Sequence, residues 1–175
     1  MPPEAKLEKT EHGVRAAEAG WFVVNLANAE WAENGMFGQW SKLEGPDGFP
    51  HFGINVHVIQ PGQPSCRYHE ESAQEAFLVL RGECILLVEE EERHLRAWDF
   101  VHCPPGTKHV FVGAGDGPCA ILMVGHRPES NAIRYPSSEL ARQHRAGVDE
   151  ETSSPKVAYA DAPESSEIKA PFPPA

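Results

Sequence analysis

Two short stretches carry most of the information about the fold: residues 69–82, HEESAQEAFLVLRG, and residues 104–109, PPGTKH. In the first, a histidine and several acids precede an apolar run that ends at a glycine. In the second, a proline–proline–glycine turn leads into a histidine. Proline and glycine restrict the direction of the chain at such turns. Imidazole and carboxylate groups are common metal ligands. The two stretches therefore predict β-strands whose ends could hold a divalent metal.

The sequence on both sides of these stretches is a series of short strand-like segments, each rich in Val, Ile, Leu or Phe and bounded by turn residues or charges. They are residues 21–26, 36–40, 51–60, 75–80, 84–88, 93–97, 100–103, 109–112 and 119–124. Residues 51–60 alternate between polar and apolar side chains, which is the period of a strand. Closely spaced strands without intervening helices predict an all-β antiparallel sandwich or barrel.

The length of 175 residues suits one domain with flanking segments. Residues 1–20 are polar and lack apolar periodicity, so we predict a flexible N-terminal arm. The barrel is expected over residues 21–126. Residues 127–175 are predicted to form one helix, at 137–144 with a serine N-cap, and then an extended acidic and proline-rich tail. This tail either packs on the barrel or stays mobile.

Charge and composition exclude several classes of partner. The net charge is −11 and the basic residues are scattered, which argues against nucleic acid. No apolar run approaches the roughly 18–20 residues of a membrane helix. The N-terminal residues lack a signal-peptide pattern. The four cysteines are far apart and are expected to be reduced thiols, so a cytoplasmic location is predicted.

The two stretches together resemble the two sequence motifs of the cupin superfamily, over roughly residues 50–125. Glu75 and Gly82 stand at the spacing of the first motif. His69 and Glu71 occupy its His-x-His positions, with a glutamate in place of the second histidine. Residues 104–109 match the second motif. The resemblance implies a double-stranded β-helix, or jelly-roll, barrel.

A metal site is also expected from the residue types. Residues two apart on a strand point to the same side, so His69 and Glu71 could converge, and Glu75 has the same parity. With His109 they would form a mixed nitrogen and oxygen site that suits Zn²⁺, Fe²⁺, Mn²⁺ or Ni²⁺. The alternative is that Glu71 is a solvated surface acid and both histidines are ordinary hydrogen-bonded residues.

Further site residues follow from the same interpretation. Glu75 and Glu71 are the candidates for moving a proton during catalysis. Five residues are predicted to line the substrate pocket: Asn55, His57, Tyr68, Phe77 and Phe111.

Three functions remain open from the sequence. The first is a metal-dependent cupin enzyme acting on a small organic molecule, with oxygenase-like chemistry favoured if iron binds. The second is a non-catalytic barrel that binds or senses a small ligand, with a structural metal or none. The third is a sugar-phosphate isomerase or epimerase, although no cluster of Arg or Lys lies near the motifs. A homodimer is predicted from the open sheet edges and the flanking arms.

Overall fold

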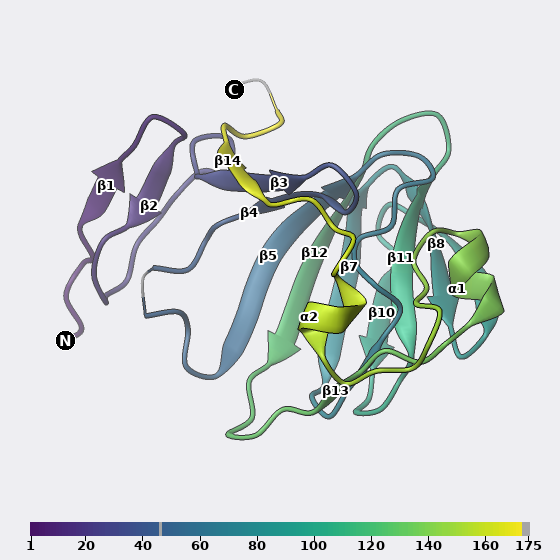
Figure 1. Ribbon diagram of the computed structural model, residues 1–175. Coiled ribbons are helices and arrows are strands. Elements are labelled where there is room, and N and C mark those ends of the chain that lie inside the picture. The colour runs from purple at the N-terminus through teal and green to yellow at the C-terminus, as the bar shows by residue number, and fades with distance from the viewer. Residues whose placement is uncertain (46, 173–175) are drawn as a thin grey trace.

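A computed structural model describes residues 1–45 and 47–172, and its largest element is a seven-stranded sheet (Figure 1). The strand order is β10-β7-β12-β5-β4-β3-β14, and every pair is antiparallel. The strands are β3 (Trp31–Asn34), β4 (Gly38–Ser41), β5 (Phe52–Ile59), β7 (Glu75–Arg81), β10 (Phe100–Cys103), β12 (Cys119–His126) and β14 (Ser166–Ile168).

A second, three-stranded sheet of order β11-β8-β9 packs against the large one. Its strands are β8 (Glu83–Val88), β9 (Glu91–Arg96) and β11 (His109–Ala114). A short pair, β6 (Glu70–Glu71) with β13 (Ile133–Arg134), forms a separate two-stranded sheet. This architecture confirms the predicted all-β jelly-roll barrel.

The core lies between the two sheets, because strand alternation directs every second side chain inward. Phe77 and Val79 of β7 point into this core, whereas Leu78 and Leu80 point to the outer face. The buried members of the core are Ile59, Phe77, Val79, Cys84, Leu86, Cys103, Phe111, Cys119 and Ile121.

Gly113 of β11 allows the loop after β5 to lie against the small sheet. A Cβ at this position would be 2.1 Å from the carbonyl oxygen of Gln60, so only glycine permits the approach. The loop continues along β11 through bridges that pair Pro64 with Val112 and His69 with His109. The same packing therefore brings the two predicted histidine ligands side by side.

The N-terminal region differs from the expectation of a flexible arm. Residues 1–20 contain a hairpin of β1 (Leu7–Lys9) and β2 (Val14–Ala16). No strand forms at 21–26, where Val24 and Leu26 instead pack on the outer face of the large sheet. The first strand of the large sheet is instead β3, and its Trp31 is fully buried in the same outer cluster.

The C-terminal region packs along its own barrel, from α1 (Glu139–Gln143) through α2 (Pro155–Ala158) to β14 at the far edge of the large sheet (Figure 1). Helix α1 lies within the predicted range, and its N-cap Ser138 accepts a hydrogen bond from the Ala141 amide. The last part of the predicted tail, residues 173–175, lies outside the described residues. No helix in the described part of the chain is long and apolar enough to cross a membrane.

Candidate metal centre

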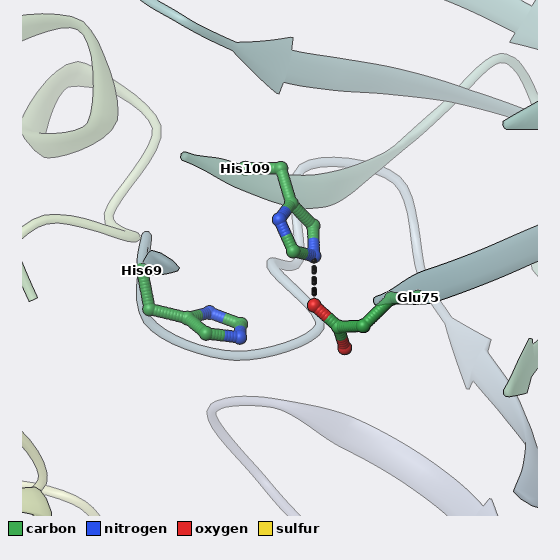
Figure 2. A group of neighbouring side chains, drawn as sticks. All are labelled: His69, Glu75 and His109. Carbon is green, nitrogen blue, oxygen red and sulfur yellow. Dashed lines mark ion pairs between the residues drawn. The ribbon is translucent and has the colours of Figure 1, made fainter. Parts of the chain in front are cut away.

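Three of the four predicted ligands meet at one end of the barrel (Figure 2). His69 precedes β6, Glu75 is the first residue of β7, and His109 is the first residue of β11. One ligand atom from each residue lies within 4.8 Å of the other two. His109 Nε2 is 3.4 Å from Glu75 Oε2. The three side chains come from separate elements, and the packing of the two sheets is what places them together.

Both imidazole rings are oriented by main-chain carbonyl groups. His69 Nδ1 lies 2.8 Å from the Arg67 carbonyl oxygen, and His109 Nδ1 lies 3.0 Å from that of Thr107. A carbonyl oxygen only accepts, so in each neutral ring Nδ1 carries the proton and Nε2 keeps the lone pair. Metal-ligating histidines are commonly held in this way. The donor set therefore fits a divalent metal ion at the two Nε2 atoms and the Glu75 carboxylate.

Glu71, the fourth predicted ligand, lies beside this cluster. Its Oε1 is 3.7 Å from His69 Nε2, and its Oε2 accepts a hydrogen bond from Asn131 Nδ2 at 2.7 Å. Glu71 is 21% exposed, compared with 3% for His109. Glu71 therefore lies at the rim of the site, where its carboxylate can exchange a proton with solvent.

Burial and mutual charge shift the pKa values of all three clustered residues. Burial raises the pKa of Glu75 to about 7; His69 lowers it in part, and the Glu71 carboxylate raises it further. Burial, followed by the charge of His69, lowers the pKa of His109 to about 4. Burial lowers the pKa of His69 as well, but Cys66, the Arg67 carbonyl and Glu75 outweigh it and raise the value to about 9. The raised pKa of Glu75 means that its buried carboxylate lacks sufficient positive charge nearby, and a bound cation would supply that charge.

The cluster opens onto a cleft of about 310 Å³. Phe77 and Phe111, both predicted pocket residues, line it with ring centroids 4.8 Å apart. The Phe77 ring is also 5.2 Å from the His109 ring, so apolar surface directly borders the metal ligands. Asn55 lines the cleft from β5. A small organic molecule in this cleft would contact both the ligand cluster and an aromatic wall.

The remaining two predicted pocket residues lie elsewhere. His57 lines an adjoining groove and contributes nothing to the wall of the cleft. Tyr68 is buried in a separate cluster with Leu87 and Val110, and its hydroxyl accepts from the Glu90 amide. Tyr68 lies in a bend before His69, so the alternation of a strand does not set its direction.

Asn131 and Arg127 are among the cleft residues that the sequence prediction missed. Asn131 reaches Glu71 from the connection after β12, and Arg127 of the same connection lines the cleft. Neither belongs to a motif or to a predicted strand. No local signal marks them, because only the return of the chain after β12 brings them to the cleft.

Comparisons with known proteins agree with this architecture. Residues 55–125 match the sequence model of the cupin domain. No curated protein matches the chain. Among solved structures, a cupin 2 domain-containing protein from Halorhodospira halophila is 19% identical, with a TM-score of 0.50, over 61% of this chain and 75% of that one. A predicted oxalate decarboxylase from Thermotoga maritima is 16% identical, with a TM-score of 0.54, over 61% of this chain and 100% of that one.

A sugar phosphate isomerase of the cupin superfamily from Silicibacter pomeroyi is 28% identical, with a TM-score of 0.48 over 54% of this chain. The match spans 63% of that protein, less than two thirds of its length. Residues 55–125 are thus similar to the cupin domain in sequence, and the barrel has the fold of the Halorhodospira halophila and Thermotoga maritima proteins.

Proposed function

We propose that this protein is a metal-dependent cupin enzyme that acts on a small organic molecule. The observation that carries the proposal is the convergence of His69, Glu75 and His109 at the cleft, with Nδ1 of each ring held by a carbonyl oxygen and Nε2 directed at a carboxylate. The ions considered take four to six ligands, so three protein ligands leave positions for water or substrate. Open positions distinguish a catalytic metal from a structural one.

The residues of this chain have distinct parts in the proposed chemistry. His69, His109 and Glu75 would hold the ion, which when bound supplies a Lewis acid or, if it is iron, a centre for oxygen chemistry. Glu71 at the rim is placed to take or give a proton, with Asn131 holding one of its oxygens. Phe77 and Phe111 keep water away from the substrate side of the cleft.

A sugar-phosphate substrate finds less support. Arg127 is the one arginine or lysine among the described residues lining the cleft, and both its terminal nitrogens bind the Glu44 carboxylate, at 2.6 and 3.0 Å. Recognition of a phosphate calls for a free cation or a cluster of donors. We therefore favour a substrate without a phosphate group.

The proposal can be tested by metal analysis of the untagged protein. The protein is incubated with Fe²⁺, Mn²⁺, Zn²⁺ or Ni²⁺ and then desalted before the bound metal is measured. We expect about one bound ion per chain for at least one of these metals, as in other three-ligand sites. His109→Ala should reduce metal affinity by more than the roughly 10–100-fold that is lost when a hydrogen-bond partner of a ligand is removed. His102→Ala removes an exposed histidine of β10 and should bind metal like the wild type.

Circular dichroism of both variants should confirm the fold, since His109 is buried. If the folded wild type binds none of the four ions, or if His109→Ala binds as well as His102→Ala, the metalloenzyme proposal is wrong.

A further inference from the structure

A second cavity adjoins the metal cleft. This aromatic groove, of about 590 Å³, lies between the β4–β5 region of the large sheet and the chain after α2, and its walls include Phe37, Trp40, His57 and Tyr159. It shares Asn55, Ser65 and Cys66 with the cleft, so the two cavities meet along these residues. A molecule bound at the metal centre could extend into the groove.

Two side chains that line the groove, Asn55 and His57, carry hydrogen-bond acceptors. The side-chain oxygen of Asn55 is buried and accepts no hydrogen bond within the described chain. His57 Nε2 lies 2.7 Å from the Phe37 carbonyl oxygen, so this nitrogen carries the proton of the neutral ring and Nδ1 keeps the lone pair. Burial lowers the pKa of His57 to about 4, so the ring is neutral at pH 7. A buried acceptor without a partner is costly, and a ligand that donates a hydrogen bond would remove that cost.

The walls of the groove are aromatic and carry no positive charge. Phe37 and Tyr159 pack edge to face with centroids 5.2 Å apart, and the Trp40 and His57 rings are 5.9 Å apart. No arginine or lysine is among the described residues that line the groove, whereas Glu164 lines it. This lining disfavours an anionic group and favours a flat or apolar one.

We propose that the aromatic groove is the substrate subsite of the metal centre, and that it binds the part of an uncharged molecule that combines a ring or apolar face with a hydroxyl donor. The hydroxyl donates to Asn55 or His57 while the apolar face packs on Trp40 and Tyr159. This inference rests on the proposed function for its link to the metal, but the groove itself exists without an ion.

Binding of four related probes to the metal-free protein tests the groove independently of the metal. The probes are benzyl alcohol, toluene, benzoate and benzylamine. Their binding is followed by changes in the NMR signals of the Trp40 indole and the His57 ring. We expect benzyl alcohol to bind at least about five-fold more tightly than toluene, in line with one net hydrogen bond. Benzoate should bind more weakly than benzyl alcohol.

Asn55→Leu keeps the side-chain volume and removes the unpaired oxygen, so it should reduce the preference for benzyl alcohol over toluene. Asn28→Leu, at an exposed asparagine before β3, should keep the wild-type preference. His57→Phe provides a second variant if Asn55→Leu fails to fold.

Equal binding of alcohol and toluene, or tightest binding of benzoate or benzylamine, would overturn the inference about the ligand. If probes bind as expected but no metal is retained, the groove stands and the metal proposal fails. If metal binds but no probe shifts the Trp40 or His57 signals, only the groove proposal fails.

Discussion

His57 shows how one buried side chain connects stability to pH. Its side chain lies among Trp40, Phe37 and the β5 backbone, and only one ring nitrogen has a protein partner. Burial lowers its pKa from 6.5 to about 4, because a charged ring would lose its hydration without gaining a counterion. In the unfolded chain the ring takes up a proton as the pH falls below 6.5, whereas the folded protein resists protonation until about pH 4.

This difference predicts that the His57 contribution to the free energy of unfolding is fully present above pH 6.5 and declines as the pH falls toward 4. Between pH 7.5 and pH 5 the loss from this residue is about 2 kcal/mol. Urea unfolding of wild type and His57→Gln at both pH values should show a smaller decline for the variant. The exposed His94→Gln serves as the control and should follow the wild type. Parallel pH profiles for wild type and His57→Gln would contradict the prediction.

At the scale of elements, Arg67 connects the C-terminal segment to the barrel. Its side chain is 7% exposed and donates to the carbonyl oxygens of Ala158, Arg145 and Gly147, and it pairs with Asp161. The Arg67 carbonyl also accepts from His69 Nδ1. One residue therefore holds the wall of the aromatic groove and orients His69, a candidate metal ligand.

We predict that Arg67→Met lowers the free energy of unfolding by about 1–3 kcal/mol, because it leaves the buried Ala158 carbonyl and two partly buried carbonyl groups without their donor. It should also speed proteolysis of the segment after residue 145, since that segment loses its anchor. Arg93→Met, at an arginine 57% exposed on β9, should change stability by no more than about 0.5 kcal/mol. Urea unfolding and limited proteolysis measure both effects. Equal stability of the two variants would show that Arg67 anchors nothing.

At the scale of the whole molecule, the outer face of the large sheet is covered on one side only. A cross-strand row runs from Val56 through Leu122 and Leu78 to Phe100. The terminal segments cover the Val56 side, where Val24, Leu26 and Phe172 pack. At the other end Phe100 is 66% exposed on β10, an edge strand, and the nearby Trp98 is 76% exposed. Such an apolar edge favours pairing with another chain.

We propose that a second copy of the chain covers this face, as the predicted homodimer requires. Light scattering should then give about twice the chain mass of 19.2 kDa, since a two-fold dimer pairs the same patch on both chains. Phe100→Glu should return the mass to that of one chain. Val157→Glu, at an exposed apolar residue of α2, should leave the dimer intact. A wild-type mass of one chain would refute the dimer.

The barrel, and three of the four residues predicted as metal ligands that cluster in the structure, could be predicted from the sequence alone. Short apolar runs at 75–80 and 109–112, bounded by turn residues or charges, predict strands there, and each of the two strands begins with a residue of the cluster. The histidine after the proline–proline–glycine turn is His109, which the structure finds in the cluster. These features are local, so neighbouring residues suffice to predict them.

Which polar residues share a cavity could be seen only in the folded structure. Asn131 joins Glu71, and Tyr159 closes the groove opposite His57, through contacts between segments far apart in the chain. The course of the terminal segments could not be predicted from the sequence either. Strand β14 pairs with β3, although its composition resembles that of a mobile tail. The physical reason is that these positions depend on packing against surfaces that exist only after the barrel has formed, and local periodicity carries no information about such distant partners.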